Sequence, residues 1–190
     1  ALRRRRDGQA TAEAIEPWTE AIVRLGRALD EARTNLVSKL RPYFGEACAA
    51  LGLAAAEVDY SPSEVSETML EERLGRDIER GTTGVGPHRC DFRLTAAAGD
   101  LRAFGSQGQQ RAAVLGLLLA EAACLSAMGR PPALLLDDVL SELDRDRRIG
   151  LLTLLEAQKQ TLVTSTETEP LLEPTCVVRV SEDSVTVSVG

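Results

Sequence analysis

Apolar residues recur at intervals of three or four positions along the first long segment of the chain. They are Trp18, Ile22, Leu25, Leu29, Ala32, Leu36 and Leu40. This spacing predicts a helix with a narrow apolar seam, of the kind found in coiled coils and helical hairpins. Pro42 is expected to end that helix, because proline cannot donate the helical hydrogen bond. The alanine-rich residues 45–56 predict a second helix.

Shorter elements are predicted between residues 57 and 100. A short strand is expected at 58–60. The next helix is expected to end at Gly81, and its apolar face consists of Met69, Leu70, Leu74 and Ile78. Apolar and polar residues alternate over 89–96, which predicts a half-buried strand with Cys90, Phe92, Leu94 and Ala96 on one face. A turn is expected at 98–100.

The second half of the chain predicts a parallel sheet. Residues 107–128 form the strongest predicted helix, rich in Ala and Leu and ended by Gly129 and Pro131. A strand at 133–136, a helix near 145–157 and a strand at 161–163 make a strand–helix–strand unit, whose two strands are parallel. Two alternating runs, 176–180 and 184–189, predict a hairpin around Glu182-Asp183. The fold class is therefore α/β.

Composition fits an ordinary folded protein. The chain has 190 residues and is 44% hydrophobic, enough for one domain or two small lobes. We expect no membrane association, because no uninterrupted apolar run reaches the roughly 18 residues of a membrane span and no signal-peptide pattern is present. The cysteines are far apart, which predicts reduced thiols in the cytoplasm; they are Cys48, Cys90, Cys124 and Cys176.

Charge is distributed unevenly. The net charge of −7 does not by itself indicate a nucleic-acid-binding protein. Residues 1–41 contain nine Lys or Arg against six acidic residues, whereas residues 46–80 contain three against nine. Any contact with a phosphate backbone is therefore expected in the N-terminal segment. Arg3 to Arg6 fit a solvated helix face or a frayed end equally well.

Two adjacent carboxylates follow the apolar strand at 133–136. Asp137 and Asp138 are expected at the carboxyl end of a parallel strand, where ligands bind in open α/β sheets. In nucleotide-hydrolysing proteins an aspartate there holds Mg²⁺, and the next acidic residue can orient and deprotonate the attacking water. The alternative is a core strand whose aspartates only cap the following segment.

The sequence SQGQQ begins the long helix at 107–128. Ser106 is a good N-cap and Gln109 lies three residues later, which predicts a capping box. A capping box does not explain Gly108, which costs about 1 kcal/mol of helix propensity in the first turn. Glycine lets a ligand approach the backbone, and exposed N–H groups at a helix N-terminus suit an anion such as phosphate.

SQGQQ, followed by LLLDD and SELD, resembles the second half of an ABC-type head domain. Together with GPHRCD at 86–91, it resembles the RecF family of bacterial recombination mediators, related to SMC-like ATPases. The family usually has Arg where this chain has Gln107. The resemblance implies the C-terminal half of an ABC/SMC-like ATPase head with an inserted helical arm lobe. Residues 1–80 would be the arm (lobe II) segment and residues 81–190 the head.

The resemblance also implies roles for individual residues. Asp137 is the Walker B carboxylate that binds the metal, and Asp138 takes the position of the catalytic acid. The signature loop, which contacts ATP bound on a partner subunit, comprises Ser106, Gly108, Gln109 and Gln110. The D-loop crosses the dimer interface and comprises Ser141 to Asp144. Thr166 or Ser165, in VTST at 163–166, lies near the switch position, where many relatives have His.

The chain lacks a Walker A motif. Its two lysines, Lys39 and Lys159, are not in a Gly-rich loop, so no Lys is placed to neutralise the β- and γ-phosphates. In the family this motif is in the N-terminal half, so the chain is expected to be a C-terminal portion that is inactive alone. His88, in GPHR, is expected to be buried and held by its neighbours rather than catalytic.

By resemblance the whole protein is an ATP- and Mg²⁺-dependent DNA-repair clamp in the cytoplasm. It would form an ATP-dependent homodimer, bind single-stranded or gapped DNA, and help load the strand-exchange recombinase together with other recombination mediator proteins. Two alternatives stay open. One is the head of another SMC-like or anti-phage ATPase. The other is a non-enzymatic remnant that only dimerises or binds DNA.

Overall fold

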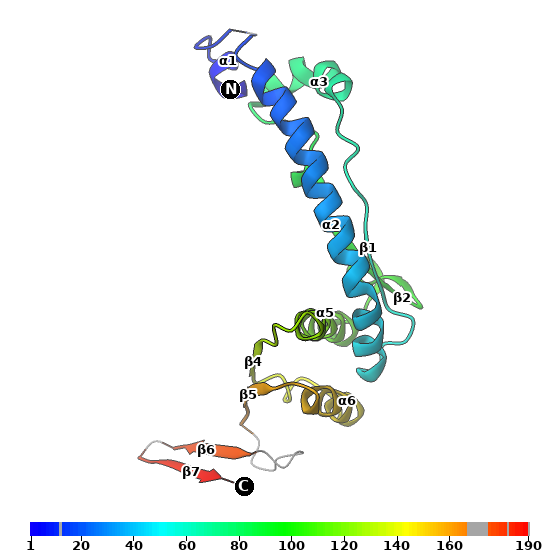
Figure 1. Cartoon of the computed structure of the whole chain (residues 1–190), viewed down its shortest axis with the longest axis vertical. Coiled ribbons are helices and arrows are strands. Elements are labelled where there is room, and N and C mark those ends of the chain that lie inside the picture. Colours follow the sequence, from blue (N-terminus) through cyan, green and yellow to red (C-terminus); the bar gives the residue numbers. More distant parts are fainter. Residues whose placement is uncertain (12, 167–174, 182, 190) are drawn as a thin grey trace.

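A computed structural model describes residues 1–190 except 12, 167–174, 182 and 190. The long helix α2 forms an arm, with α1 and α3 at one end and α5, α6, β4 and β5 at the other (Figure 1). The helices are α1 Leu2–Arg6, α2 Glu16–Ala50, α3 Glu67–Arg80, η1 Pro87–Arg89, α4 Leu101–Phe104, α5 Gln107–Ala127 and α6 Arg145–Glu156. The strands are β1 Glu57–Tyr60, β2 Phe92–Ala96, β3 Gly99–Asp100, β4 Ala133–Asp137, β5 Gln160–Thr164, β6 Cys176–Val180 and β7 Val185–Val189.

Helix α2 continues through Pro42 to Ala50. The predicted end at Pro42 and the separate helix over 45–56 are therefore wrong. Proline inside a helix costs about 3 kcal/mol, because it removes a hydrogen bond and crowds the preceding turn. Phe44 and Cys48, on the next two turns, are fully buried where α2 packs on α5. Burying each such side chain contributes about 1.5–3 kcal/mol, which offsets the effect of Pro42.

Most of the apolar seam predicted along α2 is exposed in this structure, although Leu40 is buried and Ile22 is half-buried. Trp18 is 61% exposed and Leu36 is 53% exposed. The helix instead buries a neighbouring face, which includes Val23, Asp30 and Phe44. The spacing correctly predicted a helix, but it did not predict which face would pack against the rest of the chain.

Strand β1 joins the arm segment to the head segment. It pairs antiparallel with β2, and β2 pairs with the short strand β3. Val58 of β1 is buried in the same cluster as Phe44 of α2 and Ala113 of α5. The strand predicted from residue 89 begins only at Phe92, since residues 87–89 form a 3₁₀ turn. Residues on both sides of the predicted domain boundary near residue 80 pack in this one core. The boundary itself stays a prediction.

The predicted strand–helix–strand unit is confirmed. Strands β4 and β5 are parallel, with Leu134 opposite Thr161 and Asp137 opposite Thr164. Helix α6 connects them. One side of the pair is buried in a cluster with α5 and α6 that includes Leu134, Leu136, Leu143, Leu151, Leu152 and Leu155. The hairpin of β6 and β7 is also confirmed, although Glu182 of its predicted turn lies outside the described residues.

Helix α5 has apolar residues on more than one side because it lies between two cores. Ala112 and Leu115 pack with β4 and α6, whereas Ala113 and Ala120 pack with α2 and β1. Its length and apolarity would also suit a membrane-crossing helix. Part of this apolar surface is buried between the two clusters, whereas Val114 and Leu118 are exposed.

All four cysteines are free, and Cys48 and Cys124 are buried. Burial raises the pKa of the Cys48 thiol to about 12, so this thiol stays protonated near neutral pH.

Among the residues that the structure describes, none covers the other face of the β4–β5 pair. Leu135 is 73% exposed and Leu162 is 61% exposed. Parallel strands are normally buried on both faces and belong to larger sheets. Leu134 and Leu136 are buried on the α5 side, whereas Leu162 is exposed on the other face. The alternation of side chains along β4 explains this outcome.

We expect the chain expressed alone to bind a hydrophobic dye and to aggregate. Replacing Leu135 and Leu162 together with Lys should reduce dye binding and change the melting temperature little, because both side chains are already in water. Leu136→Lys is the matched control in the same strand; it should unfold the domain, because it places a charge in the core. A sharp melt of the unmodified chain without dye binding would contradict this expectation.

Candidate nucleotide site

The candidate site lies at the carboxyl ends of β4 and β5. Because the strands are parallel and in register, Asp137 and Thr164 end side by side. The Thr164 hydroxyl donates a hydrogen bond to Asp137 Oδ1 at 2.5 Å. This contact fixes the carboxylate at the mouth of the sheet while leaving Asp137 exposed to solvent. The predicted position of Asp137 at a strand end is therefore confirmed.

The backbone of Asp138 is held in an unusual conformation. Its φ is +48°, in the left-handed region where Asp and Asn occur more readily than most other residues. Its N–H donates to both Thr164 O at 3.2 Å and Thr164 Oγ1 at 3.0 Å. Its carbonyl accepts from Ser141 Oγ at 2.8 Å. Three contacts thus fix the backbone beneath an exposed carboxylate, which suits a group that must act on a bound ligand.

The predicted D-loop is a compact turn anchored at three points. Leu143 is buried in the core, and its N–H donates to Leu140 O at 3.2 Å. Glu142 forms an ion pair with Arg111 of α5 at 3.3 Å. Asp144 caps α6, accepting a hydrogen bond from the Arg147 N–H at 3.0 Å. Ser141 and Asp144 thereby lie on a loop attached to both α5 and α6.

The predicted capping box at the start of α5 is confirmed. The Gln109 N–H donates to Ser106 Oγ at 3.3 Å, and the Ser106 N–H donates to Gln109 Oε1 at 2.9 Å. Gln110 is also engaged, because its side-chain amide donates to Leu101 O at 2.9 Å. The side chains of Ser106, Gln109 and Gln110 are therefore all engaged within this subunit, and Gly108 is the one member of the predicted signature loop without a side chain.

Gly108 has a neighbour that the sequence did not predict. A Cβ added at Gly108 would lie 2.9 Å from the Nη1 atom of Arg147 in α6. The guanidinium of Arg147 therefore lies against the first turn of α5. The expectation that a ligand approaches this backbone stays a prediction.

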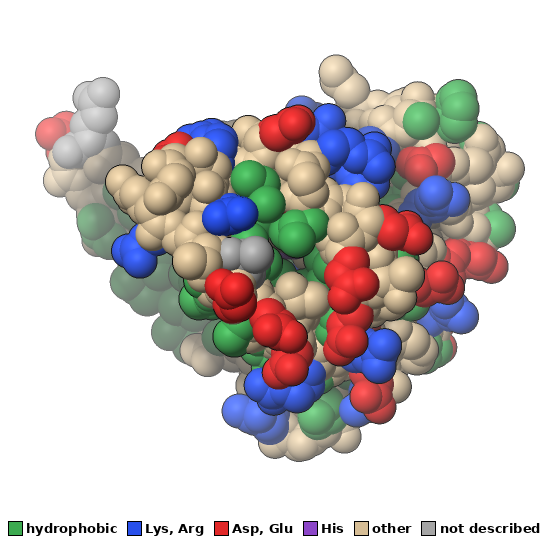
Figure 2. All heavy atoms as spheres, turned by 90° about the horizontal axis from the view of Figure 1, so that it is seen from above, with side chains coloured by type: hydrophobic (Ala, Val, Ile, Leu, Met, Phe, Trp, Pro, Cys, Tyr) green, Lys and Arg blue, Asp and Glu red, His purple; other side chains and the backbone are tan. Residues whose placement is uncertain are grey.

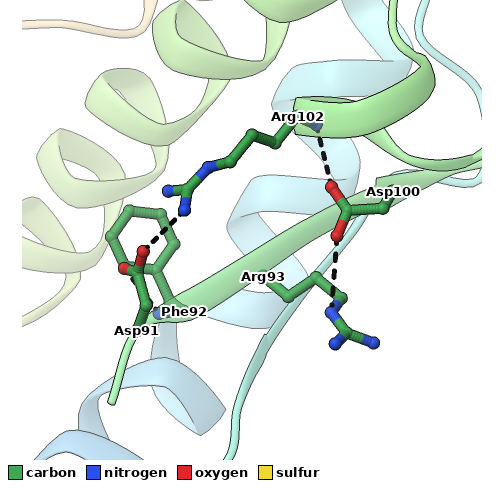
Figure 3. Close-up of polar contacts among 5 residues, drawn as sticks. All are labelled: Asp91, Phe92, Arg93, Asp100 and Arg102. Carbon is green, nitrogen blue, oxygen red and sulfur yellow. Dashed lines mark hydrogen bonds and ion pairs between the residues drawn. The ribbon is translucent and has the colours of Figure 1, made fainter. Parts of the chain in front are cut away.

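The segment GPHRCD connects the arm to the signature loop. Arg33 of α2 donates to Pro87 O at 2.6 Å, and a Cβ at Gly26 would meet the Pro87 ring at 3.3 Å. Asp91 pairs with Arg102 of α4 at 2.9 Å, while Asp100 accepts from the Arg102 N–H (Figure 3). The helix α4 held in this way leads directly into Ser106.

His88 is exposed, so the expectation of a buried histidine is wrong. The docking of this segment depends on the carbonyl of Pro87 and on the Pro87 ring, not on the imidazole. The exposed ring is available to solvent.

A buried carboxylate holds this part of the arm together. Asp30 accepts hydrogen bonds from the hydroxyl of Tyr60 and from the N–H and hydroxyl of Ser63. Burial opposes ionisation, but the hydrogen bonds from Tyr60 and Ser63 and the nearby Arg33 hold the pKa of Asp30 below its usual value. Burial and the hydrogen bond to Asp30 raise the pKa of Tyr60. The cluster is structural, tying α2 to β1 and to the turn that follows it.

A mostly apolar cavity of about 560 Å³ lies beside these loops. Its polar lining comes from the first turns of α5, from the end of β4 and from the D-loop, and includes Gln107, Gln110, Arg111, Asp137 and Glu142. Exposed apolar residues from α5 and β4, among them Val114 and Leu135, complete it. The structure thus brings Asp137, one end of the predicted signature helix and the D-loop around one hollow.

Asp137 is suited to act as a ligand of Mg²⁺. The described residues contain no group of three acidic, His or Cys side chains able to hold a metal by themselves. Mg²⁺ is usually bound by one or two carboxylates together with substrate phosphates and water. A single exposed carboxylate at a strand end, hydrogen-bonded on one oxygen, matches this donor set.

Sequence reasoning missed Thr164. Thr166 and Ser165 were predicted near the switch position, and both directly follow β5 in exposed positions. The residue that contacts both aspartates is instead Thr164. Aligning the ends of the two parallel strands would have identified it, since Asp137 and Thr164 each end a strand. The switch role of Ser165 or Thr166 stays a prediction.

The chain resembles known proteins in sequence and in structure. A scan against family models found no match. The chain is 37% identical to the DNA replication and repair protein RecF of Natranaerobius thermophilus, over 88% of this chain and 49% of that protein. It is 40% identical to RecF of Anaeromyxobacter dehalogenans, over 86% and 49%. A solved structure of the recombination mediator protein RecF-ATP in the RecFOR pathway matches with a TM-score of 0.78 and 28% identity, covering 99% of this chain and 54% of that one.

The chain matches the C-terminal half of RecF. It spans about half the length of the curated RecF relatives. The predicted ABC-type fold class is confirmed by the RecF structures, since the likeness covers nearly the whole chain.

Proposed function

We propose that this RecF-like chain supplies the metal-binding, signature and D-loop half of an ATP-binding head in a recombination mediator for DNA replication and repair. The observation that supports this proposal most strongly is the cluster of polar side chains at the carboxyl ends of β4 and β5. Asp137 and Asp138 are both hydrogen-bonded to Thr164. The D-loop follows directly, and the ion pair between Glu142 and Arg111 connects it to α5, the helix that Ser106 caps. ATP and Mg²⁺ are the proposed cofactors, because the matched structures are of RecF-ATP and one carboxylate suits Mg²⁺.

Each proposed catalytic residue has a defined task. Asp137 holds Mg²⁺, which when bound neutralises charge on the phosphates. Asp138 accepts a proton from the attacking water, and its fixed backbone limits where the carboxylate can move. Thr164 keeps Asp137 oriented. Ser106 and the N–H groups at the start of α5 contact the γ-phosphate of ATP bound to the other subunit of a homodimer.

DNA and other recombination mediators are the proposed partners, and the cytoplasm is the proposed location. The RecF structures are titled as parts of the RecFOR pathway, and the matched relatives are named for DNA replication and repair. Seen from above, from the end of the arm that carries α1 and α3, basic and acidic side chains are interspersed (Figure 2). The proposed DNA contact is Arg3 to Arg6 of α1, which are exposed at this end of the arm, away from the head (Figure 1).

We expect the chain alone not to bind Mg-ATP, because it has no Gly-Lys-Ser/Thr loop to cradle the phosphates. A RecF-length protein, in which an N-terminal half containing that loop precedes this chain, should bind Mg-ATP and dimerise. Calorimetry on both proteins and sedimentation velocity on the longer one test this. Micromolar binding by the chain alone, or a longer protein that stays monomeric with ATP, would contradict the proposal.

A further inference from the structure

Arg147 lies where three parts of the molecule meet. Its side chain is only 23% exposed, although it is an arginine in the first turn of α6. Its Nη1 pairs with Asp144 Oδ2 at 3.3 Å, and its N–H donates to Asp144 Oδ1 at 3.0 Å. Arg147 is therefore bound twice to the last residue of the D-loop.

The same side chain reaches the signature loop. A Cβ at Gly108 would lie 2.9 Å from Nη1 and 3.8 Å from Cζ of Arg147. Every residue other than glycine would thus compete with the guanidinium for this space. Gly108, which lowers helix propensity, makes room for Arg147.

The stem of Arg147 passes the end of the arm helix. A Cβ at Gly52, directly after α2, would lie 4.0 Å from Arg147 Cγ. One turn further along α6, Gly150 packs so closely on α2 that an added Cβ would lie 1.9 Å from Ala50 O. This packing fixes α6 on the arm helix and directs Arg147 toward α5.

We propose that Arg147 is a positioning residue that sets the D-loop and the signature loop relative to each other. In the proposed dimer, Asp144 of the D-loop and Gly108 of the first turn of α5 both face the partner subunit, and Arg147 contacts both of them. This inference rests on the proposed function and adds a residue that the motifs did not indicate. It also assigns Gly108 a role within its own subunit.

The test uses Arg147→Ala, Gly108→Ala and the double variant in the RecF-length protein. Loss of Arg147 should weaken ATP-driven dimerisation by about tenfold, within the range of coupling between contacting residues. Gly108→Ala should have a similar effect, because its methyl group displaces the flexible guanidinium. The double variant should be no weaker than either single variant. In all three variants the ATP affinity of the monomer should not change. The melting temperature of Gly108→Ala should not fall.

Arg145→Ala is the matched control, an exposed arginine in the same turn of α6, and should dimerise normally. Sedimentation velocity measures dimerisation, and calorimetry measures ATP affinity. Normal dimerisation of Arg147→Ala, or losses that multiply in the double variant, would overturn the positioning role and leave the proposed function intact. If the unmodified protein does not dimerise with ATP, both are overturned.

Discussion

Asp138→Asn in a RecF-length protein is expected to slow ATP hydrolysis by about 100-fold, the scale of a lost general base. The amide keeps the size of the side chain but cannot accept the proton of the attacking water. Asn also tolerates the left-handed backbone that Asp138 adopts, so the contacts with Thr164 and Ser141 should survive. ATP binding should therefore be retained, and closed dimers should accumulate.

Steady-state turnover and calorimetry separate these effects. The matched control is Asp146→Asn, which removes an exposed carboxylate from the first turn of α6, outside the proposed site. It should hydrolyse ATP at the normal rate. If Asp138→Asn turns over ATP as fast as the unmodified protein, Asp138 is a structural residue at the end of β4 and not the base.

Ser106→Arg is expected to abolish ATP-driven dimerisation while leaving ATP binding to each monomer intact. Ser106 is exposed at the start of α5, so a long side chain there would meet the partner subunit rather than its own core. The substitution also removes the cap. Ser106→Ala is therefore the control, since it loses the cap, at a cost of about 1 kcal/mol, without adding bulk.

Gel filtration with and without ATP measures the result. The alanine variant should dimerise more weakly, because it loses the hydroxyl but keeps the N–H groups at the start of α5, whereas the arginine variant should elute as a monomer. Dimers of Ser106→Arg in the presence of ATP would show that this loop does not contact the other subunit.

Local sequence signals were sufficient to predict the elements whose ends are set by residues close to them in the sequence. The capping box at Ser106, Gly81 at the end of α3 and the apolar strand before Asp137 were all predicted from neighbouring residues. These signals depend on backbone geometry within a few positions. They therefore do not require knowledge of the tertiary structure.

Predictions failed where distant contacts decide the outcome. Helix α2 continues through Pro42 because Phe44 and Cys48 are buried against α5, which the proline itself cannot reveal. His88 is exposed because the chain docks through Pro87. Arg147 has no motif, and only the approach of α6 to α5 shows its contact with Gly108.

Mixing two inactive variants tests the central claim, that this chain completes an ATP site on a second subunit. Asp138→Asn retains an intact signature loop, and Ser106→Arg retains an intact Asp138. A mixed dimer then contains one site with Asp138 from one subunit and Ser106 from the other. One complete site is expected to hold this dimer closed although its other site carries both substitutions, so mixing should raise ATP hydrolysis well above that of either variant alone. If the mixture remains as inactive as its components, the two residues do not act across a dimer interface, and the account is wrong.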